Sequence, residues 1–230
     1  NGGASWTQQF RNQVKGAFFD CFAFFDRTHG IAMSDPVNGR YLLVATENGK
    51  NWKPLNTGPS AREGEAAFAA SGTCLTAAGS RLLLASGAGP TARVFWSDDR
   101  GRTWHTSETP VPAAQPGAGI FALAFRDAQN GIAIGGNYEQ PDQTATVAVT
   151  QDGGKTWTAA GTTSYTSGAA WSRSGASLLA VGTPGTRLST DAGQTWSSIG
   201  SEEYNAVQFA SENVAYAVGP RGKIAKLVRR

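Results

Sequence analysis

The sequence contains little that could hold a metal. Only 2 cysteines and 2 histidines occur among 230 residues, and Cys21 and Cys74 lie far apart in the chain, outside any Cys-x-x-Cys motif. A zinc site is therefore effectively excluded, and no residue pattern indicates another metal or a cofactor. The two cysteines could pair in an exported protein or remain as two buried free thiols, and the sequence leaves both open.

Charge and long apolar runs are also scarce. Charged residues make up 16% of the chain and the net charge is +3, which is too weak to indicate a nucleic-acid partner without a clustered basic patch. No apolar run approaches the length of a membrane span. Hydrophobic residues still make up 40%, so a substantial core can form and disorder is not expected.

Glycine and tryptophan are frequent, with 29 and 7 copies, and one motif that contains both is repeated. The pattern Ser/Thr-x-Asp-x-Gly-x-Thr-Trp, known as the Asp-box, recurs along the chain. Three copies are nearly perfect, at residues 97–104, 150–157 and 189–196. A degenerate copy spans residues 45–52, and a fifth begins at the first residue and spans 1–6.

The spacing within the motif suits a tight hairpin. The Asp accepts backbone N–H groups of the turn, the Gly supplies a left-handed residue, and the Trp can pack between neighbouring sheets. Turn capping alone explains the Asp, so these residues are interpreted as structural and not as catalytic or metal-binding. The predicted structural set is Asp99, Gly101, Trp104, Asp152, Gly154, Trp157, Asp191, Gly193 and Trp196.

Each box has the same surroundings. Two short apolar strands and a third strand precede it, and a fourth follows the Trp, as in residues 121–125, 131–134 and 145–149 before the box at 150–157. Four antiparallel strands per repeat are typical of a β-propeller blade. The fold class predicted is therefore an all-β propeller of four-stranded antiparallel blades, about five of them in this chain.

The repeat length also bears on how the ring closes. Successive box tryptophans are 46, 52, 53 and 39 residues apart (52−6, 104−52, 157−104 and 196−157), which suits blades of about 40–50 residues. We expect a single domain over residues 1–230, with residues 1–12 as the outer strand of the closing blade. A larger ring with further blades upstream is the alternative.

Together with the linking segments at 26–36 and 125–133, boxes such as TQDGGKTW at 150–157 resemble bacterial relatives of the photosystem II stability/assembly factor propellers. The resemblance covers essentially the whole chain. It implies a propeller of commonly seven blades, an export signal ahead of it and hence a periplasmic or secreted location. In photosynthetic organisms such propellers bind a reaction-centre precursor, and nothing in this sequence indicates a photosynthetic host.

Candidate binding residues lie in the loops opposite the boxes. Since every box joins strands three and four, the loops between strands two and three and between blades emerge on the other face, where function usually resides. An arginine enters the third strand in most blades, and we expect Arg40, Arg93, Arg187 and Arg221 at one height near the central channel, joined by Arg62, Glu63 and Tyr138. The alternative interpretation is a set of exposed cations that discourage edge-to-edge aggregation.

These residues predict a non-enzymatic scaffold that binds a protein or peptide, with an acidic or C-terminal segment as the expected partner. A sialidase-like glycoside hydrolase is the alternative, because Asp-boxes occur in such enzymes. The chain has no Arg-Ile-Pro segment and no diagnostic nucleophile–base arrangement, so no catalytic residue is assigned.

Overall fold

The computed structural model describes residues 1–228 and contains five antiparallel sheets that follow one another along the chain. The first blade is made of β1 (Phe19–Phe24), β2 (Gly30–Val37), β3 (Arg40–Thr46) and β4 (Trp52–Leu55). The second is made of β5 (Leu75–Ala78), β6 (Arg81–Ala85), β7 (Arg93–Ser97) and β8 (His105–Glu108). Within each of these blades, every strand pairs with the next one in sequence, as expected of a propeller.

The remaining blades repeat this order. The third consists of β9 (Ala118–Phe125), β10 (Gly131–Asn137), β11 (Ala145–Thr150) and β12 (Thr158–Thr163). The fourth consists of β13 (Gly168–Trp171), β14 (Leu178–Gly182), β15 (Gly185–Ser189) and β16 (Ser197–Gly200). The fifth has three strands, β17 (Ala206–Ser211), β18 (Val214–Val218) and β19 (Ile224–Val228), with the short 3-10 helix η1 (Pro220–Gly222) before β19.

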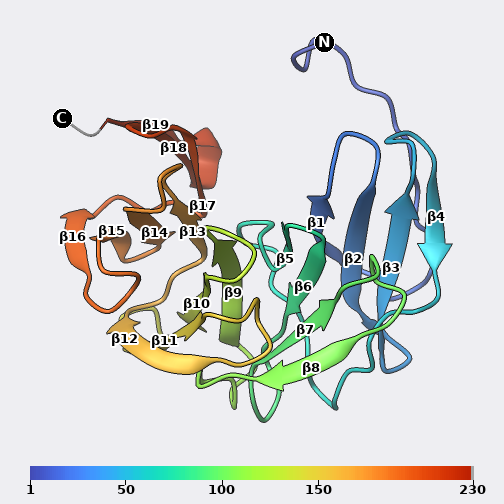
Figure 1. Ribbon diagram of the computed structural model, residues 1–230, viewed down its shortest axis with the longest axis horizontal. Coiled ribbons are helices and arrows are strands. Elements are labelled where there is room, and N and C mark those ends of the chain that lie inside the picture. Colours follow the sequence, from blue (N-terminus) through green and yellow to red (C-terminus); the bar gives the residue numbers. More distant parts are fainter. Residues whose placement is uncertain (229–230) are drawn as a thin grey trace.

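The blades form an arc, with the first blade at the right of Figure 1 and the last at the upper left. The first strand of each blade packs against the first strand of the next, as in β1 with β5 and β13 with β17. Buried apolar side chains form one cluster at each of the four seams between successive blades. The predicted fold class, an all-β propeller, is confirmed.

The Asp-box hairpins have the geometry that their residues dictate. In the second blade the carboxylate of Asp99 accepts the backbone N–H of Arg102 at 3.0 Å and of Thr103 at 2.8 Å. Gly101 has φ +80, a left-handed conformation that favours glycine. The indole N–H of Trp104 donates to the Gly101 carbonyl at 3.1 Å, so the turn also orients the ring.

These hydrogen bonds hold the box carboxylates in their ionised form. The hydroxyl and N–H of Thr195, together with the Ser189 hydroxyl, lower the pKa of Asp191 to about 2. Trp157 is buried, 8% exposed, whereas Trp104 and Trp196 are half-buried against the clusters at their seams. All three box tryptophans therefore lie between sheets, with one more deeply buried than the others.

The N-terminal segment differs from the expectation. Residues 1–18 contain no strand, and the fifth sheet has three strands within the described residues, so the predicted outer strand at 1–12 is not formed. Gln9 instead accepts a hydrogen bond from the Trp52 indole at 3.1 Å, which places this segment beside the first blade. The two ends of the arc lie apart in Figure 1, and the segment would have to cross that opening to reach β19.

Candidate functional site

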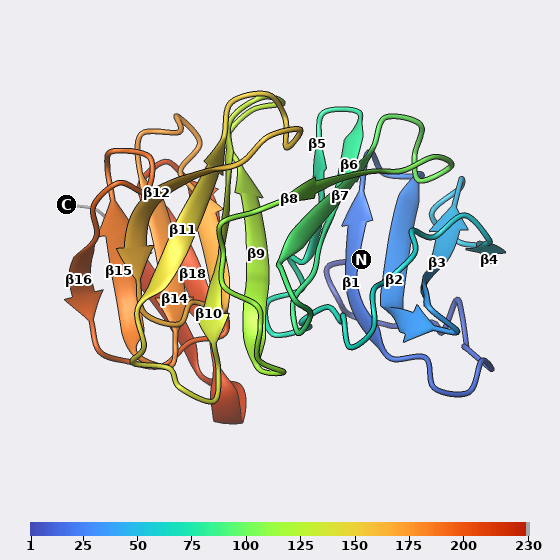
Figure 2. The same cartoon turned by 90° about the horizontal axis from the view of Figure 1, so that it is seen from below.

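The loop face is the edge of the molecule opposite the Asp-boxes. The strands stand side by side, and their connections collect at two opposite edges (Figure 2). The box hairpins occupy one edge, since they join the third and fourth strands. The connections between second and third strands, and those between blades, emerge at the other edge, which we call the loop face.

A long connection between the first two blades, the 56–74 loop, organises one half of this face. Its central residue is Glu65, whose side chain is almost fully buried. The carboxylate accepts two hydrogen bonds from Arg93, one of them from Nε at 2.8 Å, and one from the Ser86 hydroxyl at 2.6 Å. It also accepts the backbone N–H of Arg62 at 2.8 Å.

This arrangement keeps Glu65 ionised. Burial on its own would raise the pKa of the carboxyl, but the hydrogen bonds from Arg93, Ser86 and the N–H of Arg62 outweigh it and lower the pKa. A buried bidentate pair of this kind is costly to break, because either partner alone would be an uncompensated charge. The pair therefore anchors the 56–74 loop against the second blade.

Arg62 of this loop and the neighbouring Arg40 are exposed cations. The Arg40 guanidinium donates to the carbonyl of Gly58 at 3.0 Å. Arg62 donates to the Thr91 hydroxyl at 2.9 Å and to Glu108 at 2.8 Å. These three contacts orient the two guanidinium groups, and both side chains keep access to solvent.

The prediction that Arg93 lines an open binding face is wrong. Its side chain is 9% exposed, paired with Glu65, and its guanidinium carbon lies 4.5 Å from the centre of the Phe95 ring. The sequence shows an arginine entering a strand, but it does not show that the loop from the preceding blade returns a carboxylate to it. Arg93 is thus a packing residue beneath the loop face.

The arginines also lie at different positions along the third strand relative to the box, whereas one common height was predicted. Arg40 and Arg93 are the first residues of β3 and β7, whereas Arg187 lies in the middle of β15, opposite Ala180 and Ser198. Counted back from the box hydroxyl residue, the offsets are 46−40=6, 97−93=4 and 189−187=2. Loop length varies between blades, so the same residue type enters at a different point of each strand.

Arg221 lies in η1 of the fifth blade, exposed and with φ 57. No contact links Arg187 or Arg221 to Arg40, Arg62 or Arg93 within residues 1–228. The structure therefore gathers Arg40, Arg62 and Arg93 around the 56–74 loop and leaves the other two in separate blades.

Tyr138 belongs to an aromatic cluster next to the 56–74 loop. Phe68 of that loop stacks on Phe121 of β9 with ring centres 4.0 Å apart. The Tyr138 ring meets both edge-on, at 6.5 and 6.3 Å, and the residue is 51% exposed. Tyr165 completes the cluster at 4.9 Å from Phe121. The loop face thus presents an exposed aromatic side chain close to the loop that carries Arg62.

Glu63 is exposed in the 56–74 loop, while two carboxylates that the sequence prediction missed lie on the first blade. Burial and the charge of Asp35 raise the pKa of Asp20 to about 7, and one oxygen of Asp20 is buried without a hydrogen-bond partner. Burial also raises the pKa of Asp35. The signal was a carboxylate inside the apolar strand Phe19–Phe24.

Cys21 and Cys74 form a disulfide in the structure, which resolves the alternative left open by the sequence. The bond links β1 to the residue just before β5, and therefore joins the first two blades. Within residues 1–228, no group of three or more His, Cys, Asp or Glu side chains is placed to hold a metal ion. Over the same residues, the structure has no helix that is long and apolar enough to span a membrane.

Repeated four-stranded blades joined at box-lined seams define an Asp-box β-propeller. The sequence matches the family described as Sortilin-Vps10 (sortilin, neurotensin receptor 3) over residues 40–180, more than half of the chain. The chain therefore belongs to the Sortilin-Vps10 family. No curated protein matches it.

Solved propellers resemble the chain in fold. A structure described as YCF48 bound to D1 peptide is 19% identical with a TM-score of 0.58, over 91% of this chain and 63% of that chain. The GH74 enzyme of Niastella koreensis is 16% identical with a TM-score of 0.68, over 87% of this chain and 34% of that one. The WD40 propeller of Doa1 is 12% identical with a TM-score of 0.60, over 94% and 67%.

This chain spans less than two thirds of the length of the first two of these proteins. At such identities the resemblance shows the fold alone.

Proposed function

We propose that the protein is a non-enzymatic propeller scaffold that binds a protein or peptide through the 56–74 loop and its neighbours on the loop face. The observation that carries the proposal is the anchoring of this loop. Glu65 is fixed by Arg93, Ser86 and the Arg62 N–H, and the N–H of Ala67 donates to Asp35 at 2.8 Å. A loop that is already ordered loses little conformational entropy when a ligand binds.

The chemistry of the exposed groups favours a peptide with carboxylates. Arg40 and Arg62 offer guanidinium groups that can bind a carboxylate in a bidentate manner. Tyr138 and Phe68 offer aromatic surface on the same loop face, and aromatic and arginine residues dominate the binding energy of protein interfaces. YCF48, which resembles the chain in fold, is described as bound to D1 peptide, and this supports peptide binding; the assembly-factor-like role rests on the resemblance in sequence.

A direct test uses a fluorescent peptide with an acidic C-terminal segment and a free terminal carboxylate, measured by anisotropy. We expect binding that weakens as salt rises, because exposed charges are screened beyond about 10 Å at 0.1 M. The double variant Arg40→Ala/Arg62→Ala should bind at least about tenfold more weakly, since each charged hydrogen bond contributes about 1.5–3 kcal/mol.

Arg27→Ala is the matched control, because Arg27 is also exposed and lies beside the degenerate box at 45–52, where its carbonyl is close to Gly49. This variant should bind as the parent does. The proposal fails if the C-terminally amidated peptide binds equally well and the Arg27 variant loses as much affinity as the double variant.

Glycoside hydrolysis is a second candidate with one observation in its favour. Glycosidases use one protonated carboxyl group as an acid and one ionised carboxylate. Asp20, with a pKa of about 7, could hold a proton near neutral pH while a second carboxylate stays ionised. The likeness to the GH74 enzyme agrees with it. A panel of fluorogenic glycosides, sialosides included, tests this candidate: turnover lost in Asp20→Asn would establish it over the scaffold.

We further propose a periplasmic or secreted location. The Cys21–Cys74 disulfide supports this, because such bonds persist in oxidising compartments and are rare in the cytosol. Thiol labelling of the protein in its host cell tests the proposal, and two reactive thiols in the unfolded, unreduced protein would contradict it.

A further inference from the structure

A pocket of about 180 Å³ lies between the first and second blades, on the edge of the molecule that carries the Asp-boxes. Apolar side chains of the first blade line its inner part, namely buried Ile31 and half-buried Phe25, Ala45 and Leu55. Both blades are four-stranded sheets, so both walls of the pocket are present. We call it the first-seam pocket.

The pocket exists because two of its lining residues are small compared with their counterparts in the second blade. Ala45 and Trp96 are equivalent, because each immediately precedes the residue whose hydroxyl donates to its own turn. His29 and Arg81 are equivalent too, because each immediately precedes the strand residue that pairs with that hydroxyl residue. Asp26 also holds the His29 ring within its own loop, 2.8 Å from Nδ1.

At the second seam, Arg81 and Trp96 fill the equivalent space. Arg81 donates to the carbonyls of Asp152 and Gly153 in the next box, at 3.2 and 2.9 Å. Its guanidinium carbon lies 4.5 Å from the centre of the Trp96 ring. This place between a blade and the next box thus accommodates a flat aromatic ring together with a guanidinium group.

Two guanidinium groups of the second blade line the first-seam pocket without a carboxylate partner. Arg100 and Arg102 are exposed, and neither forms an ion pair within residues 1–228. The box carboxylate of Asp99 is occupied by hydroxyl and N–H groups of its own turn. The Arg100 guanidinium carbon lies 5.5 Å from the centre of the Phe25 ring. Glu47 also lines the pocket, and the two arginines outweigh its charge.

The volume and the chemistry of the pocket favour a small ligand. An apolar cavity of about 150 Å³ holds one benzene ring, so 180 Å³ accommodates a single ring with a small substituent. Guanidinium groups bind carboxylates in a bidentate manner and lie favourably over aromatic faces. A ring that carries a carboxylate satisfies both parts of the pocket.

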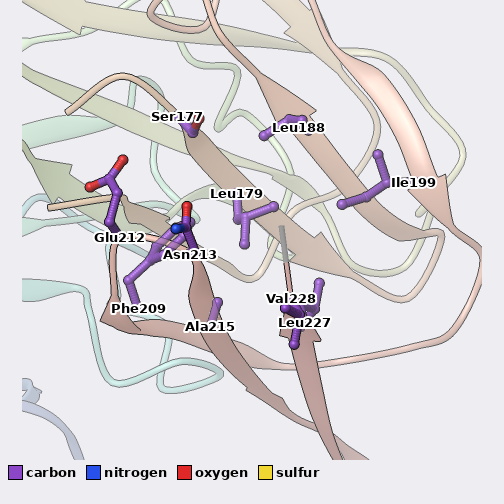
Figure 3. Close-up of a pocket in the computed structure, with 10 residues that line it drawn as sticks. All are labelled: Ser177, Leu179, Leu188, Ile199, Phe209, Glu212, Asn213, Ala215, Leu227 and Val228. Carbon is purple, nitrogen blue, oxygen red and sulfur yellow. The ribbon is translucent and has the colours of Figure 1, made fainter. Parts of the chain in front are cut away.

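Pockets at two other seams lack this combination. The one at the third seam is about 70 Å³, too small for a ring, and its Arg126 lies 3.7 Å from Asp127. The pocket of about 390 Å³ at the last seam is lined mostly by apolar side chains such as Leu179 and Phe209 (Figure 3). No arginine or lysine among the described residues lines it.

We propose that the first-seam pocket binds a small monocyclic aromatic carboxylate. The ring lies on Phe25, Ala45 and Leu55, and the carboxylate binds Arg100 and Arg102. The ligand thereby takes the place that Trp96 and Arg81 fill at the second seam. This site lies on the edge opposite the loop face and does not depend on peptide binding there.

The first test uses phenylacetate as the probe and the full chain as the protein, with dissociation constants measured by ligand-observed NMR. Phenylacetamide keeps the ring without the charge, and acetate keeps the charge without the ring. We expect each to bind at least about tenfold more weakly than phenylacetate, because each lacks one of the two groups that the pocket binds. Either analogue binding as tightly as phenylacetate would overturn the proposal.

Removal of the two cations tests the assigned residues. Arg100→Ala/Arg102→Ala should weaken phenylacetate binding at least about tenfold, since charged hydrogen bonds are the strong ones. Lys50→Ala/Lys53→Ala is the matched control, because it removes two exposed cations of the neighbouring hairpin that do not line the pocket. This control should bind as the parent does, and an equal loss in both double variants would reduce the effect to general attraction by surface charge.

The sharpest test is His29→Arg, which adds a cation but fills the pocket as Arg81 does at the second seam. We expect binding to weaken at least about tenfold, because a filled space excludes the ring. General attraction of anions to a basic surface would instead strengthen binding. Ala45→Trp fills the pocket without a change of charge and should weaken binding equally, with thermal melts of both variants confirming that the fold is kept. Folded variants that both retain binding would overturn the proposal.

Discussion

The first and last seams of the arc differ in what fills them. The first holds the box tryptophan Trp104, the Cys21–Cys74 disulfide and the buried Arg93–Glu65 pair. Within residues 1–228, the last has no box tryptophan and contains a pocket of about 390 Å³ between Leu179 and Leu227. Its blades are joined by a buried apolar cluster that includes Leu179, Val181 and Val207, and by hydrogen bonds such as that from the Ser167 hydroxyl to the Asn205 carbonyl at 2.9 Å.

The comparison shows that the Asp-box does more than close a hairpin. The turn hydrogen bonds lie within one blade, but the glycine and tryptophan pack against the preceding blade. A seam without a box therefore lacks its largest apolar side chain and remains partly open. Stability should consequently decrease from the box-filled seams to the last one, and the following variants test this.

The largest effect is expected for Trp157→Ala, at the seam between the second and third blades. Truncation of a buried large aromatic costs about 3–5 kcal/mol of unfolding free energy. Leu188→Ala, beside the existing pocket, should cost less than about 2 kcal/mol because its side chain is only partly buried. Urea denaturation of both variants measures the difference, and equal losses would show that the two seams are packed alike.

A similar loss is expected for Arg93→Ala at the first seam. The substitution leaves Glu65 buried without its partner, at a cost of about 3–5 kcal/mol. Arg221→Ala, at an exposed position of the fifth blade, should change stability by no more than about 0.5 kcal/mol. If thermal melts of the two variants coincide, the pair does not anchor the 56–74 loop.

Reduction of the disulfide should have a smaller effect. The bond joins residues separated by 53 positions, and loss of such a cross-link typically costs about 2–4 kcal/mol. Urea denaturation with and without dithiothreitol measures the change. The variant Cys21→Ala/Cys74→Ala should show no response to the reductant, and a response there would place the effect outside the first seam.

The smallest effect is a pH dependence of stability that arises in the first blade, where Asp20 lies in the innermost strand β1. The equivalent strand of the last blade, β17, has no carboxylate. The pKa of Asp20 rises from 3.8 to about 7 on folding, so between these values the folded state keeps a proton that the unfolded state has lost. Stability should fall as pH rises through this window, by about 1–2 kcal/mol after allowance for solvent screening. Asp20→Asn should remove most of this slope, with Asp35, whose pKa is also raised by burial, contributing the remainder; an unchanged slope would assign it to another group.

The repeat could be predicted because each box is a local structure. Asp99, Gly101 and Thr103 interact within a few residues, so their spacing is visible in the chain. The binding face could be predicted only in part. Arg62 in the 56–74 loop and Arg40 beside it are exposed, but Arg93 is buried, because its partner Glu65 comes from a distant part of the chain.

The sequence by itself determined the blades, their order and the edge to which each loop belongs, since alternating short strands and box turns depend on neighbouring residues. Only the tertiary structure decided which seams are filled, which arginines are paired and that residues 1–12 lie beside the first blade. These outcomes depend on contacts between residues far apart in the chain. Loop lengths and the curvature of the arc set such contacts, and a repeat pattern encodes neither.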